Sequence, residues 1–492
     1  MRGSTRRTRP VSWFVVSLLV LPGAFAAAVD KTGRARAGEA ETHYERGLSQ
    51  ERQGDLPAAR ASYAAALAAD PGLAPAHDRL GFVLGRQGDT LGAIAAFEKA
   101  VALDPRLFDA QYHLGATLWW TKQVERARSA LEAAVKLQPN HAEARYYLGL
   151  VLLAEGDAAG AVSSLRRAVK AAPKLAVAHH QLGLALQRQG ALDAALTELR
   201  RAVELDPKLK DARNSLGLAL MQKGEAEEAV ATFQALVERD ETSAIARLNL
   251  GNALLQKADL DGAIAVYREL IERDPTSAEA FYNMGVALKQ KDDFAGAEAA
   301  LRKAIVLDAR LSDAAYTLGI VLWQTRRPAE ALEHLRSAIA LRPEYAEAHF
   351  ALGTILRQQG QTEEALAEFR ETVRHRPASA EAYLSIGQIL QQKRDAAGAA
   401  TAFAEAERLN KRKADAQAAT LAVGVGRQRL ERGDLAGAIE RFREAVRLDP
   451  ENADAHHRLG LALRRQGAAA EARTHLAAAR RLAPELFGPE PE

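Results

Sequence analysis

The sequence predicts an all-α protein built as a solenoid of about thirteen tandem helix-turn-helix units. A glycine, usually preceded by leucine, recurs every 34 residues along almost the whole chain. Each unit holds two short stretches in which apolar residues have helical spacing, separated by a turn. The composition suits many short helices, because Ala, Leu, Arg and Glu are abundant and only 5% of the residues are aromatic.

The glycine series fixes the repeat boundaries. It begins at Gly47, keeps the 34-residue interval through Gly387, and resumes at Gly426 after five extra residues. This glycine defines position 8 of each repeat. The predicted segments are repeats 1–11 over residues 40–410, a basic insertion at 411–418, repeats 12 and 13 over 419–486, and a tail at 487–492.

The insertion interrupts an otherwise regular period. It carries Lys411, Arg412 and Lys413 in a row, a charge run that is most naturally solvated. Five added residues either lengthen the helix of repeat 11 or kink the solenoid before repeat 12, and the sequence leaves both outcomes open.

Residues 74–107 illustrate one unit. A first apolar stripe surrounds Gly81, a Gly-Asp pair breaks the helix, a second stripe begins near Ala93, and Asp104-Pro105 ends it. Gly81 and Ala93 leave almost no side chain where the two helices meet. A single hairpin of this kind cannot bury its apolar face, so we expect neighbouring units to stack.

This pattern resembles the tetratricopeptide repeat (TPR) family over nearly the whole chain. The resemblance implies a right-handed superhelix whose concave groove is lined by the first helix of each repeat. It also implies binding of peptides or extended protein segments rather than catalysis. Position 4, usually a bulky residue in the family, is often histidine here, as in His179 and His456.

The N-terminal 28 residues are typical of a secretory signal peptide. A basic start precedes the apolar run Val11–Leu21 and a small-residue region with cleavage expected after Ala26 or Ala28. Residues 29–39 are then a linker, and the mature chain has no stable membrane span, since a span needs about 20 apolar residues. We expect an exported, periplasmic protein; secretion, or anchoring by an uncleaved signal, is the alternative.

Charge and motifs exclude several functional classes. Without the four arginines of the signal segment the formal charge is close to neutral, so nucleic acid is not an expected partner. The chain has no cysteine and no nucleotide-binding, nucleophile-elbow or zinc-protease motif. The adjacent histidines at 179–180 and 456–457 diverge on a helix, which does not suit a metal pair. We therefore expect no catalytic residues, cofactor or metal.

Aromatic residues concentrate on one stripe of the first helices. At 100° per residue, positions 5, 9 and 12 share a side that differs from the Leu/Gly seam. The candidate ligand contacts on this stripe are Tyr112, Trp119 and Tyr146, and then Tyr282, Tyr316, Trp323 and Phe350. Alternatively, these rings fill space between repeats. Tyr and Trp also stack on sugars, so a polysaccharide ligand stays open.

The two tryptophan sites resemble each other. Trp119 and Trp323 both occupy position 12 and lie six repeats apart, and residues 107–123 are similar to 311–327. In both, a cation replaces the usual glycine after the first helix (Lys122 and Arg326). We infer either a duplicated block or two stations with similar contacts; two stations would strengthen binding of one extended ligand by avidity. Trp120, by contrast, is expected to pack near the joint with repeat 4.

Amide side chains form a second pattern. Such groups can bond a peptide backbone irrespective of its sequence, although polar residues are also common at this exposed end of a helix. The candidates at position 13 are Gln222, Gln256, Gln290, Gln324, Gln358 and Gln392, and those in repeats 7 and 8 are Asn249, Asn252 and Asn283. The preferred function is a non-enzymatic scaffold in an envelope, secretion or polysaccharide-export assembly; an accessory subunit of a separate enzyme is the alternative.

Overall fold

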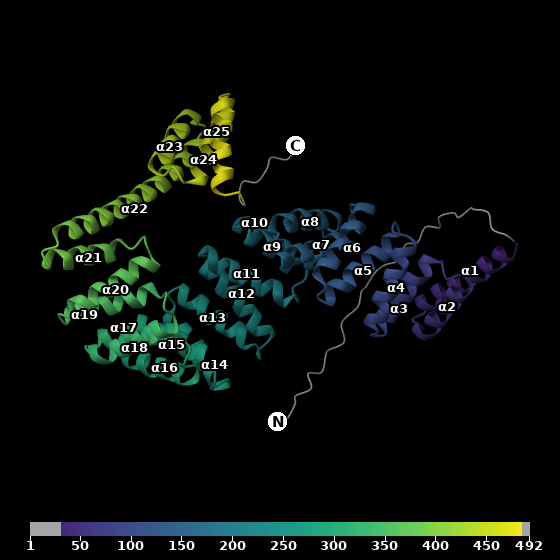
Figure 1. Cartoon of the computed structure of the whole chain (residues 1–492), viewed down its shortest axis with the longest axis horizontal. Coiled ribbons are helices and arrows are strands. Elements are labelled where there is room, and N and C mark those ends of the chain that lie inside the picture. The colour runs from purple at the N-terminus through teal and green to yellow at the C-terminus, as the bar shows by residue number, and fades with distance from the viewer. Residues whose placement is uncertain (1–30, 485–492) are drawn as a thin grey trace. The chain divides into compact units, whose positions relative to one another are not determined.

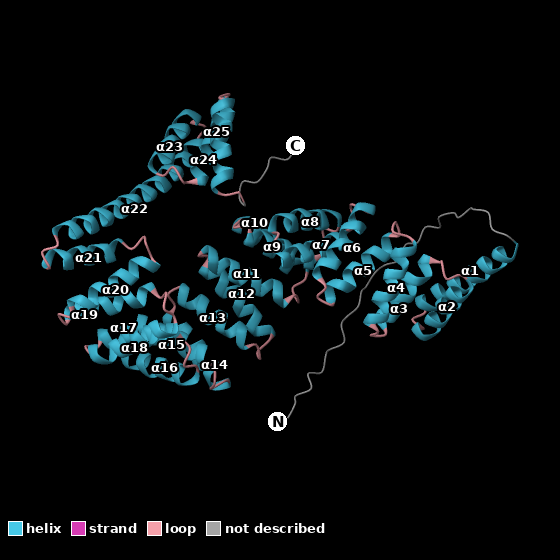
Figure 2. Ribbon diagram, viewed as in Figure 1, coloured by secondary structure: helices cyan, strands magenta, loops and turns pink. Residues whose placement is uncertain are grey.

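The computed structural model describes residues 31–484, and within that range the chain is entirely helical, with short turns and no strand (Figure 2). The chain divides into two compact units, one ending at Arg188 and one beginning at Gln189. Both are built from antiparallel helix pairs (Figure 1). The predicted all-α repeat fold is therefore confirmed.

The first unit contains the helices of repeats 1–4 and the first helix of repeat 5. They are α1 (Lys31–Arg52), α2 (Leu56–Ala69), α3 (Ala74–Arg86), α4 (Thr90–Leu103), α5 (Phe108–Trp120), α6 (Val124–Leu137), α7 (Ala142–Glu155), α8 (Ala158–Ala171) and α9 (Ala176–Arg188).

The second unit contains the remaining helices. They are α10 (Leu192–Leu205), α11 (Lys210–Lys223), α12 (Ala226–Arg239), α13 (Ala244–Gln256), α14 (Leu260–Arg273), α15 (Ala278–Gln290), α16 (Phe294–Leu307), α17 (Ser312–Gln324), α18 (Pro328–Leu341), α19 (Ala346–Gln358), α20 (Thr362–His375), α21 (Ala380–Gln392), α22 (Ala396–Glu431), α23 (Leu435–Leu448), α24 (Ala453–Gln466) and α25 (Ala469–Leu482).

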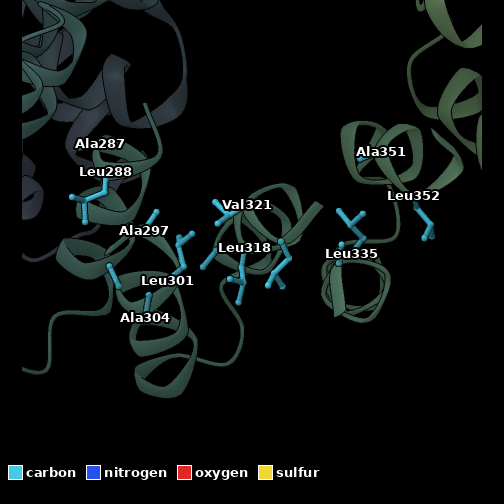
Figure 3. Packing of buried hydrophobic residues seen from close by; sticks show 14 of the residues in the cluster. Ala287, Leu288, Ala297, Leu301, Ala304, Leu318, Val321, Leu335, Ala351 and Leu352 are labelled. Atoms are coloured by element: carbon cyan, nitrogen blue, oxygen red, sulfur yellow. The ribbon is translucent and has the colours of Figure 1, made fainter. Parts of the chain in front are cut away.

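Within a repeat, the glycine of the first helix receives a large side chain of the second. A Cβ placed on Gly285 would lie 2.7 Å from Cγ of Leu301, closer than carbon atoms approach. In Figure 3, Leu318 and Val321 of α17 lie between Leu301 of α16 and Leu335 of α18. The first helix of one repeat thus packs against second helices on both sides, which makes one continuous core.

The junction between repeats is formed by small and polar side chains near the start of the first helix. Position 3 is an alanine that is at most 1% exposed in repeats 2–11 and 13, as at Ala382 and Ala455. Position 4 reaches back to the preceding turn: Nε2 of His179 lies 3.1 Å from the carbonyl oxygen of Pro173, and Nε2 of His349 lies 2.9 Å from that of Pro343. This repeated bond accounts for the histidines without a metal.

The turn inside each hairpin requires one residue in the left-handed region. Glycine occupies it in most repeats, but Lys122 and Arg326 adopt φ values of 64° and 62°. Both replace the usual glycine, as the sequence indicated. In several repeats an aspartate then caps the next helix, as at Asp293, whose carboxylate accepts from the Gly296 backbone N–H at 2.9 Å.

The basic insertion lengthens a helix. α22 runs for 36 residues and joins the second helix of repeat 11 to the first helix of repeat 12. Figure 1 shows it as one long helix between α21 and α23. Most repeats end the second helix with an Asp-Pro or X-Pro pair, whereas Asn410-Lys411 stands here. Repeats 6 and 8 also lack the proline, but there Asp240 and Asp308 accept from the backbone N–H two residues on, and the helix ends. Asn410-Lys411 offers neither the proline nor this aspartate, so the helix continues, and residues 407–418 are largely exposed.

Repeats 11 and 12 therefore do not stack on each other. A buried cluster of the second unit ends at Ala402, and the next begins at Ala419. Position 3 of repeat 12 is Leu421, which is 71% exposed although the equivalent alanines are buried. Position 28, Val373 in repeat 10, is the exposed Glu407 in repeat 11. The two faces that would meet at this junction are open to solvent.

The ends of the chain differ from the sequence expectation in one respect. The segment 29–39, predicted as a linker, is helical from Lys31 onward because its Ala, Arg, Lys and Glu residues favour continuation of α1. The predicted signal peptide and the tail from residue 485 lie outside the described residues. Between residues 31 and 484, no helix has the length and apolar character needed to cross a bilayer.

Candidate functional site

The first helices of consecutive repeats are joined by a regular side-chain relation. A residue at one position contacts the next position of the following repeat, 35 residues on. Asn249 Nδ2 donates to Asn214 Oδ1 at 2.9 Å, and Trp323 Nε1 donates to Gln358 Oε1 at 3.3 Å. Residues at positions 5, 9 and 12 therefore form rows that run across the repeats within each unit.

The tyrosines of the first aromatic station lie mainly inside the protein. Tyr112 is 4% exposed, and its ring lies 5.9 Å from Phe108, 5.2 Å from His141 and 6.2 Å from Tyr147, centroid to centroid. Tyr112 therefore fills the junction between repeats 3 and 4 rather than an open surface, which corrects its assignment as a ligand contact. Tyr146 is half-buried, and burial together with Tyr147 raises its pKa to about 12.

The two neighbouring tryptophans have different surroundings. Trp119 is half-buried, and the Lys122 ammonium lies 5.5 Å from its ring centroid, within cation–π range. Trp120 is 50% exposed and shares a hydrogen bond with the side chain of Tyr147 in repeat 4. The expected packing of Trp120 at the joint with repeat 4 is confirmed.

The second station, in the second unit, is a continuous row of half-buried rings. Tyr282, Tyr316 and Phe350 occupy position 5 of repeats 8, 9 and 10, and Trp323 occupies position 12 of repeat 9. The side chains of Tyr282 and Thr317 share a hydrogen bond across the junction, and burial raises the pKa of Tyr282. Each ring packs partly on the core and keeps part of its surface exposed.

The two tryptophan stations share backbone geometry but not their neighbours. The turn after each tryptophan holds a cation with positive φ. At Trp119 that cation covers the ring, whereas at Trp323 the indole N–H is bonded to Gln358. Similar sequence thus produces two chemically distinct environments.

The amide residues divide into exposed and structural groups. The six position-13 glutamines are all exposed, yet some bond to the preceding repeat. Gln256 Nε2 donates to the Met221 carbonyl at 2.8 Å, and Gln358 accepts from Trp323. The asparagines are half-buried and join helices. Asn252 Oδ1 accepts from Tyr267 at 2.7 Å and from Asn283 at 3.1 Å.

Two cations flank Trp323, and the aromatic pattern of the sequence does not reveal them. Position 12 is Lys289 in repeat 8 and Arg357 in repeat 10, and both are half-buried. Within residues 31–484 neither has a carboxylate partner; Arg357 donates to Gln388 Oε1 at 2.8 Å. Burial lowers the pKa of Lys289. A comparison of position 12 across the repeats for charged as well as aromatic residues would have found these two cations.

The acids at the other end of the same helices are neutralised. At position 2, Asp313 lies 2.9 Å from a guanidinium nitrogen of Arg342 and accepts from the Tyr345 hydroxyl at 2.8 Å. Glu347 pairs with Arg376 at 2.8 Å. Among the described residues, the first helices of repeats 9 and 10 therefore have these carboxylates paired, while the position-12 cations beside Trp323 have no carboxylate.

Repeats 1–3 carry a buried ionic cluster in the equivalent rows. Asp78 is 2% exposed, and its carboxylate lies 2.8 Å from Nδ1 of His113. Arg79 lies 3.7 Å from Glu51 and 3.5 Å from Asp109. Burial alone would raise the pKa of Asp78, but His113 and Arg79 outweigh it and the pKa is lowered. These groups satisfy one another, so the cluster holds the first three repeats together.

Helical hairpins whose glycine receives a Leu, Phe or Tyr side chain, stacked one on the next, define an α-solenoid repeat protein. Models of the tetratricopeptide repeat match residues 23–74, 79–130, 121–176 and 180–244, and a second TPR model matches 426–467. Residues 219–422 match the C-terminal domain of cilia and flagella-associated protein 70. The chain belongs to the tetratricopeptide repeat family.

Several solved structures match this chain over part or most of its length. MamA from Desulfovibrio magneticus is 27% identical, with 35% of this chain and 97% of that chain covered and a TM-score of 0.32. YrrB, described as a TPR protein with an unusual peptide-binding site, is 24% identical over 46% of this chain and 96% of its own, with a TM-score of 0.30. The Cut9–Hcn1 structure is 16% identical over 90% and 94%, with a TM-score of 0.33. No curated protein matches the sequence.

Proposed function

We propose that this TPR protein is a non-enzymatic scaffold that binds extended segments of other proteins along the first helices of repeats 8–10. The observation that carries the proposal is the row of half-buried Tyr282, Tyr316, Trp323 and Phe350. One side of each ring already packs on the core, so its side chain is ordered before a partner binds. The exposed side therefore offers apolar surface at little further cost in side-chain entropy.

Trp119 and Trp120 are a second contact surface of the scaffold. Trp120 is the most exposed large aromatic side chain among the described residues, and Trp119 lies beside it with Lys122 over its ring. The exposed glutamines supply amide groups that can bond a peptide backbone. Gln290, Gln324 and Gln392 are the best placed, because no bond to a neighbouring repeat holds them between residues 31 and 484.

Selection of peptides tests this function. The full chain is immobilised and used to select from a random library of 12-residue peptides, and the enriched peptides are measured by fluorescence anisotropy. Trp323→Ala is expected to weaken binding about tenfold or more, the size expected for a buried aromatic contact. Val306→Ala is the control, because Val306 is 77% exposed on the second helix α16.

Two outcomes would contradict the proposal: no enriched peptide, or enriched peptides that bind Trp323→Ala as well as the original protein. Binding to a glycan array in place of peptides, abolished by replacing Trp119 and Trp323 together, would instead support a polysaccharide-guiding solenoid.

We also propose that the protein is exported and works in the periplasm, within an envelope, secretion or polysaccharide-export assembly. The support is the basic start, apolar run and small-residue region of residues 1–28. N-terminal sequencing of the protein from fractionated native cells is expected to begin at residue 27 or 29 in the periplasmic fraction. An intact Met1 in the cytosolic fraction would overturn the proposal.

A further inference from the structure

The repeats that carry the second aromatic row also carry an uncompensated positive charge. Lys289, Trp323 and Arg357 are the position-12 residues of three consecutive first helices, α15, α17 and α19. α17 contacts both α15 and α19, so the tryptophan lies in the row between the two cations. The opposite ends of α17 and α19 carry the paired acids Asp313 and Glu347.

Lys289 differs from the paired lysines of the second unit. Lys223, Lys257, Lys291 and Lys393 each pair with an aspartate or glutamate of the preceding repeat, and Lys210 pairs with Asp240 of its own repeat. Lys289 is half-buried and has no such partner in residues 31–484. An ammonium group that is partly removed from water without an acceptor is costly, and a carboxylate brought by a ligand would relieve that cost.

We propose that repeats 8–10 select acidic extended segments, in which two carboxylates pair with Lys289 and Arg357 and an apolar side chain between them packs on Trp323. This inference rests on the proposed function and names the chemistry of the partner. Charge complementarity carries it, because no described carboxylate neutralises either cation.

The helix spacing predicts the spacing of the acids. Neighbouring packed helices lie about 8–10 Å apart, so Lys289 and Arg357, on helices separated by α17, are about 16–20 Å apart. An extended chain advances about 3.3 Å per residue and alternate side chains share a face, so the two acidic residues are expected about six positions apart, with the apolar residue two or four positions after the first.

Matched peptides test the inference on the full chain. The probes are 12-residue fluorescein-labelled peptides. The first has two glutamates six positions apart and a leucine four positions after the first glutamate, the second has both glutamates replaced by glutamine, and the third has the glutamates three positions apart. The first is expected to bind about tenfold more tightly than the third, which loses one charge-assisted hydrogen bond, and about a hundredfold more tightly than the glutamine peptide, which loses two. Raising the salt concentration is expected to reduce that difference.

Protein variants locate the contact. Lys289→Met and Arg357→Met are each expected to reduce the preference for glutamate over glutamine, and the double variant is expected to remove it, while the glutamine peptide still binds as before. Lys291→Met is the matched control in the turn that follows the same helix, because Lys291 is exposed and pairs with Asp261. The control is expected to keep the full preference.

The outcomes separate this inference from the proposed function. If the glutamine peptide, or library peptides without acids, bind as tightly as the acidic peptide, the acidic preference is wrong and the scaffold function stands. If acidic peptides bind equally to Lys289→Met, Arg357→Met and the original chain, the site is misplaced and the inference fails. If neither the acidic peptide nor any library peptide binds, both proposals fail.

Discussion

The indole N–H of Trp323 donates to Oε1 of Gln358 in the following repeat, over 3.3 Å. The bond spans 35 residues, the same separation as the bond between Asn214 and Asn249. This bond holds the half-buried indole ring of Trp323 on one side, and the apolar core contacts it on the other.

Replacing Gln358 with leucine removes the acceptor and leaves the indole N–H to water. We expect a loss of about 1 kcal/mol in the free energy of unfolding, because one neutral hydrogen bond contributes on that order. Urea denaturation followed by tryptophan fluorescence measures it. Gln324→Leu, at the same position one repeat earlier, is the control and is expected to change the midpoint little. Equal losses in both variants would mean that the bond is not what stabilises the junction.

The pair formed by His349 and Glu368 predicts a pH-dependent contribution to stability. Nδ1 of His349 lies 2.6 Å from the Glu368 carboxylate and Nε2 lies 2.9 Å from the Pro343 carbonyl oxygen. Burial disfavours the charged ring, but the carboxylate and the carbonyl outweigh burial and raise the pKa of His349. A raised folded-state pKa means that the stabilisation is present below about pH 6.5, the unfolded value, and is lost as pH rises through the folded value.

The test is Glu368→Gln. We expect it to cost about 1.5 kcal/mol at pH 5.5 and clearly less at pH 8.5, since a partly buried charge-assisted bond is lost only while the ring is protonated. Thermal unfolding at the two pH values measures the difference. Glu364→Gln, in a surface pair with Arg336 at 3.6 Å, is expected to show no such dependence. A pH-independent cost for Glu368→Gln would contradict the assignment.

Ala258 occupies a turn position that suits glycine. Its φ is 66°, in the left-handed region that a Cβ disfavours by about 1–2 kcal/mol. Because Ala258 is exposed, replacement by glycine removes the strain without losing packing. We expect Ala258→Gly to stabilise the second unit by about 1 kcal/mol, less any entropy gained by the unfolded chain. A lower denaturation midpoint in this variant would show that the turn is not strained.

The long helix α22 depends on the absence of a proline at position 411. Lys411→Pro removes a backbone hydrogen bond in an exposed helix interior, which costs about 3 kcal/mol or more, so we expect the helix to break there. The chain has no cysteine, so cysteines introduced at the exposed positions 404 and 420 can be spin-labelled cleanly. We expect a narrow distance distribution near about 24 Å in the original helix, since each residue rises 1.5 Å. The Lys411→Pro variant is expected to broaden it and Lys411→Ala to leave it unchanged; an already broad distribution in the original chain would contradict a continuous rod.

The repeat fold was predictable because every repeat needs a small residue where its two helices meet, and this residue recurs at a fixed interval. Gly285, opposite Leu301, agrees with the 34-residue period. Lys122 and Arg326 stand where the period predicts a glycine, so they are recognised as exceptions to it. The sequence left open whether the basic insertion lengthens or kinks the array. The helix is the longer one because Asn410-Lys411 provides neither the proline nor the aspartate that ends the second helix in other repeats.

The candidate site was predictable only in part, since a helical projection gives the direction of a side chain but not what covers it. Tyr112 points as predicted, yet Phe108, His141 and Tyr147 enclose it. Lys289 shows the opposite case. Among the described residues Lys289 has no carboxylate partner, whereas lysines such as Lys291 do. This difference appears only in the structure, which places the neighbouring repeats beside each lysine.

Because α22 is one uninterrupted helix, the number of residues in it determines how repeats 12 and 13 are rotated relative to repeat 11. Each residue added to or removed from the exposed stretch 407–418 turns everything beyond it by about 100° and shifts it by about 1.5 Å along the axis. A single deletion would therefore reorient the last two repeats as a whole, while a change of seven residues, two turns, would restore their azimuth to within about 20°. The number of residues in this stretch sets the direction in which the last two repeats face.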